Sequence, residues 1–451
     1  MENKKKIMYI ITMVVLLLVL GLMWFLLINN SNSEENNGPG GTPPDGNPPG
    51  GSSGNVTYSA SKEITTSEDL TSGTYSSTES DQNAISVSGS IKSSLSNITV
   101  TKTGDSDGGD NTSFYGTNSA IIAKDGATLT ISNANITTDA NGANGVFSYG
   151  GSATTNNSNS DGTTVNISDS TITTSKNNSG GIMTTGGGVM NATNLTITTA
   201  GTSSAAIRSD RGGGTVVVDK GTYKTTGKGS PVIYSTADIT VKNATLVATA
   251  SEGVVIEGKN SVTLENVELT DTNNTLNGQS TTYKNIFLYQ SMSGDAANGE
   301  ATFTSKNSKI TTNKGDSFYV TNTTATINLE NNEIVNIDST GYFLRSQKDS
   351  WGNSGSNGGV VTLNLTNQKV NGNIYIDSIS TLSISMTSSN YEGAINSDNT
   401  AKSINIKLDS TSTIKLTGDS YITSLDDSDT TYSNIDLNGY KLYVNGKELT
   451  K

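Results

Sequence analysis

An asparagine that recurs three residues before an apolar residue constrains the fold of this chain more than any other feature. Eight such pairs occur: Asn97 with Val100, Asn133 with Ile136, Asn194 with Ile197, Asn243 with Leu246, Asn266 with Leu269, Asn307 with Ile310, Asn331 with Ile334 and Asn367 with Val370. Asp169, before Ile172, and Lys220, before Tyr223, complete the series. The apolar residues follow one another at steps of 23 to 26 residues, or at longer steps of up to 41 residues. Such self-similarity is typical of stacked coils, the longer of which carry insertions.

Three short strands are expected in each coil. In the segment 201–258, Ala206–Ser209 aligns with Val232–Ser235 and then with Val255–Gly258. A turn, a second β-branched run and the asparagine-marked turn follow each of them, and a third strand begins at the apolar residue. Short runs without helical periodicity indicate strands, and a coil cannot bury its apolar face alone. The pattern predicts an all-β parallel β-helix, in which about 14 or 15 coils spaced ~4.8 Å apart would extend roughly 70 Å.

The recurrent asparagine suits a corner between two strands. Asparagine tolerates the left-handed backbone conformation better than most residues, and its amide carries both a hydrogen-bond donor and an acceptor. We therefore expect the asparagines of successive coils to adopt this conformation and to bond to one another along the stack.

Composition excludes several classes of function. The net charge is −13, which disfavours a nucleic-acid partner because such binding relies on clustered lysine and arginine. The chain has no cysteine and no histidine. Thiol chemistry, histidine acid–base catalysis, the usual zinc sites and Ser-His-Asp triads are therefore excluded.

The first 55 residues are expected to tether the rest. Residues 1–6 are a basic cytoplasmic tail, and 7–28 form an uncharged apolar run long enough to span a bilayer. No small-residue cleavage site follows, which favours a signal anchor over a cleaved signal peptide, and the basic flank places later residues outside the cell. Residues 29–55, rich in Gly, Pro, Ser and Asn, form a disordered linker. Residues 56–451 form the ectodomain, with a C-terminal cap over about 425–451.

The coil pattern resembles that of the right-handed parallel β-helix, or pectin-lyase-like, superfamily. The stretch from Ala205 to Gly258 is most similar to bacterial surface proteins of this fold that bind carbohydrate or act as adhesins. The terminal runs Ile414–Tyr421 and Leu437–Gly446 are similar to the ends of such proteins. The resemblance implies a right-handed coil and a bacterial protein, which together with the signal anchor at 7–28 predicts a location in the bacterial cell membrane. Asn438-Gly439, between alternating runs, is also a hairpin signal.

Aligned coils place several aromatic and charged residues on one outward face. The residue after the inward apolar residue of each first strand should point outward. These residues are Met183, Arg208, Tyr234, Glu257, Tyr289, Tyr319 and Arg345, and Trp351 lies in a loop that could extend the face. Rings stack on sugars while charged groups bond hydroxyls, so Arg208, Tyr234, Glu257, Tyr289, Tyr319, Arg345 and Trp351 are the candidate ligand-binding residues. The alternative is that strand surfaces favour tyrosine for packing alone.

Catalytic candidates are sparse. Enzymes on the resembled fold include polysaccharide lyases and glycoside hydrolases, and a hydrolase needs paired carboxylates. Arg208, Asp210 and Arg211 form the densest charged group near a strand end. No lyase or hydrolase motif surrounds them, and a solvated turn with a local ion pair is the favoured explanation. Enzymatic activity is therefore not the favoured interpretation.

Calcium is the one cofactor that the sequence offers. Asp105, Asp107 and Asp110 lie in a Gly-rich loop, and carboxylates in such loops bind hard cations. The loop lacks the EF-hand pattern, and an ordinary acidic surface loop is the alternative.

These patterns together predict a membrane-anchored, monomeric cell-surface protein that binds a polysaccharide or surface glycan, or acts as an adhesin, without catalysis. The alternatives are a lyase or hydrolase acting on acidic polysaccharide and a purely structural spacer.

Overall fold

The computed structural model describes residues 56–106, 109–151, 160–277 and 280–450, apart from the side chain of Asp110. The chain divides into two units, Met1–Asn37 and Gly38–Lys451, and the first lies outside the described residues. The predicted tail (1–6), membrane anchor (7–28) and linker (29–55) also lie outside them and stay predictions. Within the described ranges, no helix combines the length and the apolar character needed to cross a bilayer.

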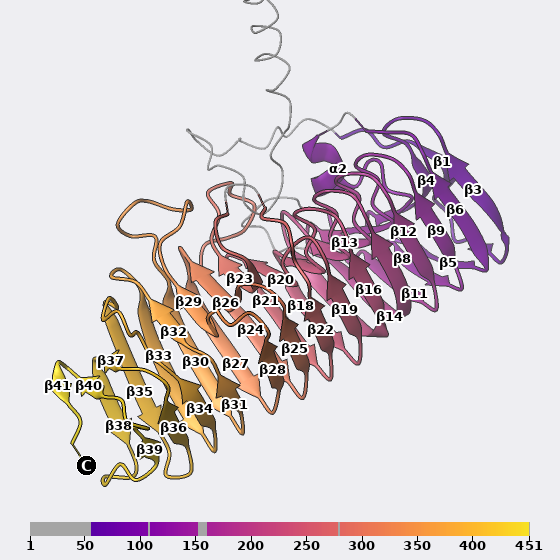
Figure 1. The fold of residues 1–451 in the computed structure, drawn as a ribbon. Coiled ribbons are helices and arrows are strands. Elements are labelled where there is room, and N and C mark those ends of the chain that lie inside the picture. The colour runs from indigo at the N-terminus through magenta and orange to yellow at the C-terminus, as the bar shows by residue number, and fades with distance from the viewer. Residues whose placement is uncertain (1–55, 107–108, 152–159, 278–279, 451) are drawn as a thin grey trace, which may run out of the picture. The chain divides into compact units, whose positions relative to one another are not determined.

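Parallel strands stack into two long sheets (Figure 1). Sheet A consists, in stacking order, of β1 (Ala60–Ile64), β4 (Asn83–Ser88), β7 (Ile121–Lys124), β10 (Val146–Tyr149), β13 (Ile182–Thr185), β15 (Ile207–Ser209), β17 (Ile233–Ser235), β20 (Val254–Glu257), β23 (Lys284–Tyr289), β26 (Asp316–Thr321), β29 (Leu344–Ser346) and β32 (Ile374–Ile376). Sheet B contains β2 (Asp69–Leu70), β3 (Gly73–Ser77), β5 (Lys92–Ser96), β6 (Ile98–Lys102), β8 (Thr128–Ser132), β9 (Asn135–Thr138), β11 (Thr164–Ser168), β12 (Thr171–Thr174), β14 (Gly188–Thr199), β16 (Gly214–Thr225), β18 (Asp238–Lys242), β19 (Thr245–Ala248), β21 (Ser261–Glu265), β22 (Glu268–Asp271), β24 (Glu300–Lys306), β25 (Lys309–Thr312), β27 (Thr324–Glu330), β28 (Glu333–Asn336), β30 (Val360–Thr366), β33 (Thr381–Thr387), β35 (Ser403–Leu408) and β38 (Ser424–Asp427).

Two smaller sheets complete the C-terminal part. They contain β31 (Lys369–Asn371), β34 (Asn390–Gly393), β36 (Thr413–Leu416) and β39 (Ile435–Asp436), and then β37 (Ser420–Ile422), β40 (Leu442–Val444) and β41 (Lys447–Glu448). The one helix in the described ranges is α2 (Asp110–Tyr115).

The predicted all-β parallel solenoid with three strands per coil is confirmed. One coil consists of β17, β18 and β19, and each of these pairs in parallel with the equivalent strand of the next coil. The apolar residues that mark the repeat pair with one another from Val100 to Ile334. In β14 and β16 the second and third strands run on through the corner, which joins them into one sheet.

The corners behave as the recurrent asparagine predicts. All eight asparagines have positive φ values between 48° and 56°, as do Asp169 and Lys220 at 49° and 67°. The Nδ2 of Asn194 donates to Asp169 at 2.8 Å, and that of Asn331 donates to Asn307 at 2.8 Å. Each corner thus meets the left-handed requirement with a residue that tolerates it, and some corners bond to the next coil.

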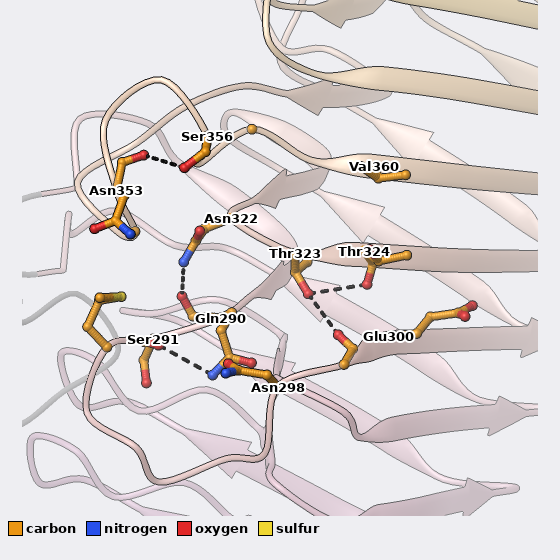
Figure 2. Close-up of a pocket in the computed structure, with 14 residues that line it drawn as sticks. Gln290, Ser291, Asn298, Glu300, Asn322, Thr323, Thr324, Asn353, Ser356 and Val360 are labelled. Carbon is orange, nitrogen blue, oxygen red and sulfur yellow. Dashed lines mark hydrogen bonds between the residues drawn. The ribbon is translucent and has the colours of Figure 1, made fainter. Parts of the chain in front are cut away.

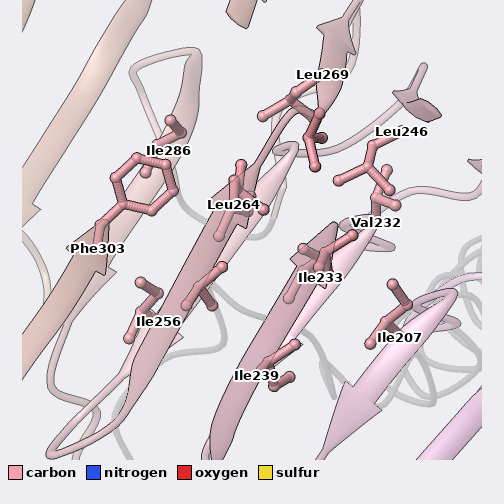
Figure 3. Packing of buried hydrophobic residues seen from close by; sticks show 14 of the residues in the cluster. Ile207, Val232, Ile233, Ile239, Leu246, Ile256, Leu264, Leu269, Ile286 and Phe303 are labelled. Atoms are coloured by element: carbon pink, nitrogen blue, oxygen red, sulfur yellow. The ribbon is translucent and has the colours of Figure 1, made fainter. Parts of the chain in front are cut away.

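The core lies between the sheets and is built from stacked columns of apolar side chains. Figure 3 shows Ile207 and Ile233 of sheet A together with Ile239, Leu264 and other residues of sheet B. Parallel pairing in register places like residues directly above one another, so each coil buries the apolar face of its neighbour.

The C-terminal cap differs in one detail from the expectation. Asn438-Gly439 has positive φ values but joins β39 to β40, which lie in different sheets, so it forms a corner. The antiparallel hairpin forms at Asn445-Gly446 instead, between β40 and β41. Both Asn-Gly dipeptides are suited to a tight turn. Whether the turn becomes a corner or a hairpin depends on whether the two strands that it joins pair with each other.

Candidate functional site

The outer face of sheet A carries one column of side chains, here called the outer column. Its members are Ile122, Phe147, Met183, Arg208, Tyr234, Val255, Phe287, Tyr319, Arg345 and Tyr375. Glu257 and Tyr289 were predicted to belong to it, but they lie two residues further along their strands and pair with each other. The prediction is wrong there because β20 contains three apolar residues in a row, any of which could be the inward residue. The sequence pattern favours Ile256 as the equivalent of Ile233, whereas in the structure Val254 pairs with Ile233.

The outer column is covered, which corrects the prediction of an exposed binding stripe. Ile122, Phe147 and Met183 are buried beside Tyr58 and Tyr149. Val255, Phe287, Tyr289, Tyr319 and Trp351 form a second buried cluster, with Tyr234 packed against it. Tyr289 and Tyr319 are only 2% and 0% exposed. The candidate residues therefore face away from the core but pack under loops, and Arg208, Tyr234 and Arg345 are the half-buried ones.

Glu257 lies at the centre of this second layer. Its carboxylate accepts hydrogen bonds from the hydroxyls of Tyr234, Tyr289 and Ser291, the one from Tyr289 at 3.0 Å. Burial raises the pKa of Glu257 to about 7, although the Ser291 and Tyr234 hydroxyls oppose the shift. Ser291 belongs to the loop 290–299, so this buried acid anchors that loop to sheet A.

In the charged turn Arg208-Ser209-Asp210-Arg211 the last three residues are buried and Arg208 is half-buried, so the turn is not a solvated one. Arg208 Nη2 lies 2.8 Å from Asp210 Oδ2, as the local ion-pair interpretation expected. Arg211 reaches Asp295 of the loop 290–299 at 2.8 Å, and its guanidinium lies 4.0 Å from the centre of the Phe114 ring on α2. Burial raises the pKa of Asp210 to about 6, while Arg208 acts in the opposite direction. The sequence did not associate Asp295 with this turn.

A second loop, 347–359, is anchored in the same layer. The Tyr319 hydroxyl donates to Asp349 at 2.6 Å, and the rings of Trp351 and Tyr289 lie 5.3 Å apart. Asn357 Nδ2 donates to the carbonyls of Asp349 and Trp351 at 2.7 and 2.8 Å, which closes the loop on itself. The predicted binding residues of this region thus position the loop.

Loop lengths create an open groove between these two anchored loops. Ten residues (290–299) join β23 to β24, and thirteen (347–359) join β29 to β30. In the coil between them, β26 and β27 are joined by only two residues, Asn322 and Thr323. Because coils stack about 4.8 Å apart, a short turn between two long loops leaves a gap about 10 Å wide at the backbone. The groove has a volume of about 630 Å³.

Polar side chains line this groove. Its floor contains Glu300, Thr324 and Val360, the first residues of three successive paired strands. Figure 2 shows Asn353 on one side of Asn322 and Asn298 on the other, and Asn322 Nδ2 donates to the carbonyl of Gln290 at 2.7 Å. The remaining lining residues are Ser291, Met292, Gly299, Thr323, Gly352, Ser356 and Gly358.

Several polar groups of the groove are available to a ligand. Within the described residues, no hydrogen bond engages the side chains of Asn298, Asn353, Glu300 or Thr324, and all four residues are exposed. Neutral amides and hydroxyls donate and accept hydrogen bonds at once, which suits a ligand rich in hydroxyl groups.

The predicted calcium loop is only partly described. Asp107 and the side chain of Asp110 lie outside the described residues, while Asp105 Oδ1 accepts from the backbone amide of Asn141 at 2.7 Å. Among the described residues no group of three acidic side chains is placed to hold a metal. Calcium binding by this loop stays a prediction.

Sequence reasoning missed every residue of the groove. One feature of the sequence does correspond to the groove. In three consecutive coils the connection between the first and the second strand has ten, two and thirteen residues. That spacing becomes readable only when strand ends are known.

No known family model matches the chain, and neither curated proteins nor solved structures show a match to it.

Proposed function

We propose that this chain is a non-catalytic surface protein whose β-solenoid presents the groove to carbohydrate. The anchor at 7–28 and the linker at 29–55 belong to this proposal and rest on the amino-acid sequence. On this proposal the protein is a monomer of the bacterial cell membrane with its solenoid outside the cell, and it has no nucleic-acid partner.

The groove between the loops 290–299 and 347–359 is the observation that carries the proposal. Free amides of Asn298 and Asn353 face a gap about 10 Å wide, above a floor that includes the Thr324 hydroxyl. Both walls are fixed by the buried layer of Tyr289, Tyr319 and Trp351. The buried aromatic residues hold both loops in place, while the exposed amides of Asn298 and Asn353 can adjust to a ligand. This favours sugar binding, because the loops lose little conformational freedom when a ligand binds.

Retention on immobilised polysaccharides tests the proposal. The full chain should be retained by at least one plant or bacterial polysaccharide, and the double substitution Asn298→Ala with Asn353→Ala should weaken retention about tenfold or more. Asn135→Ala, an exposed asparagine on β9, is the matched control and should leave retention unchanged. If no polysaccharide retains the chain, the structural-spacer or protein-adhesin interpretation takes the place of this one.

The finer fold assignment is part of the same proposal. We place the solenoid among right-handed, pectin-lyase-like β-helices because three strands per coil and asparagine corners accompany a core of stacked Val, Ile and Leu. A crystal structure with left-handed coils would reject that placement.

One observation favours a second candidate, a hydrolase or lyase. The carboxyl groups of Asp210, Glu257 and Asp295 lie in one neighbourhood with Arg208 and Arg211, and Asp295 helps to raise the pKa of both other acids. Carboxyls with raised pKa values act as general acids. Against this, Glu257 is 1% exposed and fully engaged by hydroxyls, which suits a structural role.

Product analysis separates the two candidates. If the chain is an enzyme, acidic or neutral polysaccharides should yield new reducing ends or unsaturated products, and Asp210→Asn should abolish them. Absence of products across a panel of polymers that the chain does retain would leave binding as the function.

A further inference from the structure

The charge of the groove restricts its ligand. Among the fourteen lining residues, Glu300 is the only one with an ionisable side chain, and no lysine or arginine is present. A carboxylate, sulfate or phosphate on the ligand would find no cation among these residues and would meet the repulsion of Glu300 within a chain of net charge −13. The nearest cation that packs against the lining is Lys259, whose exposed side chain lies beside Gly299. The groove therefore disfavours acidic polysaccharides.

Apolar surface in the groove is small. The large hydrophobic side chains that are exposed in the described part of the chain are Val217, Met292, Ile337, Val360 and Tyr440. Two of these, Met292 at 40% and Val360 at 52%, line the groove. No aromatic ring does, since Trp351 and Tyr289 lie in the buried layer. The groove thus offers no flat ring for the face of a sugar, but it offers two aliphatic side chains, each able to contact a methyl group.

Side-chain amides complement this apolar pair. Asn298 and Asn353 are exposed and form no side-chain hydrogen bond among the described residues. The side chain of Gln290 is buried and donates to the carbonyls of Ser291 and Ala296, so it belongs to the wall. An acetamido group presents one N–H, one C=O and one methyl group. Along an oligosaccharide with one acetamido group on each sugar, Asn298 and Asn353 can bond the polar atoms of different acetamido groups, and Met292 and Val360 can each cover a methyl group.

We infer that the groove selects a neutral, N-acetylated amino sugar over acidic sugars and over neutral sugars that lack the acetamido group. This inference rests on the proposed carbohydrate-binding function and narrows its ligand class. Glu300, on the groove floor, can accept a hydrogen bond from a sugar hydroxyl beside the acetamido group.

Titration calorimetry of the full chain with four tetrasaccharides tests this inference. The four are the tetramers of N-acetylglucosamine, of glucosamine, of β-1,4-linked glucose and of galacturonate. The N-acetylglucosamine tetramer should bind at least about tenfold more tightly than each of the others, the size of effect expected from one well-placed apolar group. Tightest binding of the galacturonate, glucosamine or glucose tetramer would overturn the inference while supporting carbohydrate binding. Binding of no sugar would overturn both.

A groove variant tests the assigned contacts. Met292→Ser combined with Val360→Thr should lower affinity for the N-acetylglucosamine tetramer about tenfold and leave affinity for the glucose tetramer unchanged. Both side chains are exposed, so the fold should persist. Ile337→Ser, which removes a 62% exposed hydrophobic side chain that does not line the groove, is the control and should bind as the unmodified chain does. Equal loss in the control, or no loss in the double variant, would refute the assigned contacts.

Discussion

The ring of Trp351 lies 5.3 Å from the ring of Tyr289, centre to centre, and is tilted 59° to it. Tyr289 ends the strand before the loop 290–299, and Trp351 lies within the loop 347–359. One aromatic contact therefore joins the two walls of the groove behind its lining. Aromatic pairs at this distance stabilise beyond the area that they bury.

Removing this ring should loosen the groove without unfolding the solenoid. Trp351→Ala deletes a side chain that is 7% exposed, and we expect a local loss of about 3 kcal/mol. Hydrogen exchange should then quicken across 347–359 and leave distant coils unchanged, because repeats contact mainly their neighbours. Tyr440→Ala, which removes a 42% exposed ring of the C-terminal cap, should leave exchange in the loop unaltered.

A glycine in the same wall gives a sharper comparison. Gly352 has φ 79°, and a Cβ there would lie 2.1 Å from Asn322 Oδ1. Gly355 has φ 87°, but a Cβ there would meet nothing within 4 Å. Both alanine substitutions carry backbone strain of about 1 kcal/mol, and only Gly352→Ala adds a clash. We expect Gly352→Ala to displace Asn322 and weaken sugar binding, whereas Gly355→Ala should bind normally. Similar affinities for both variants would contradict the assigned contact.

The buried carboxyl of Glu257 should make stability depend on pH. Its pKa is raised from 4.5 to about 7, so the folded state holds the proton more tightly than the unfolded state does. The associated stabilisation is complete below about pH 4.5 and is lost as the pH rises through 7, with a total on the order of 3 kcal/mol. Asp210, with a pKa raised to about 6, acts in the same direction.

Urea unfolding between pH 4.5 and 8 measures this effect. Glu257→Gln keeps the shape of the side chain but cannot ionise, so its unfolding free energy should fall less over that range than that of the unmodified chain. A pH dependence as steep in the variant as in the unmodified chain would assign the effect to other groups.

Lys220 is the one corner of the series that lacks Asn or Asp, and its φ is 67°. Asparagine adopts positive φ at lower cost than lysine, so Lys220→Asn should stabilise the chain by about 0.5–1 kcal/mol. Lys224→Asn changes an exposed strand residue of β16 in the same way and should not stabilise. The midpoints of urea unfolding of the two variants make the comparison, and a gain in both would point to charge rather than to backbone conformation.

Local chemistry explains what the sequence predicted well. The corner conformation of Asn97, Asn243 and their equivalents follows from one residue type, and the core columns follow from alternation within short strands. Alignment failed at Glu257 and at Asn438-Gly439, where three apolar residues in a row or two equivalent turn signals allow more than one register.

The solenoid, its repeat and its corners follow from the amino-acid sequence alone, because they depend on interactions between a residue and its equivalent in the next coil. The buried layer of Tyr289, Tyr319 and Trp351 and the groove beside it arise only when the whole chain has folded. That outcome depends on how the loops 290–299 and 347–359 fold back over sheet A. Loop sequences do not follow the repeat, so the repeat does not predict their conformation. Their contacts join residues of different coils, which come close to one another only after the coils have stacked.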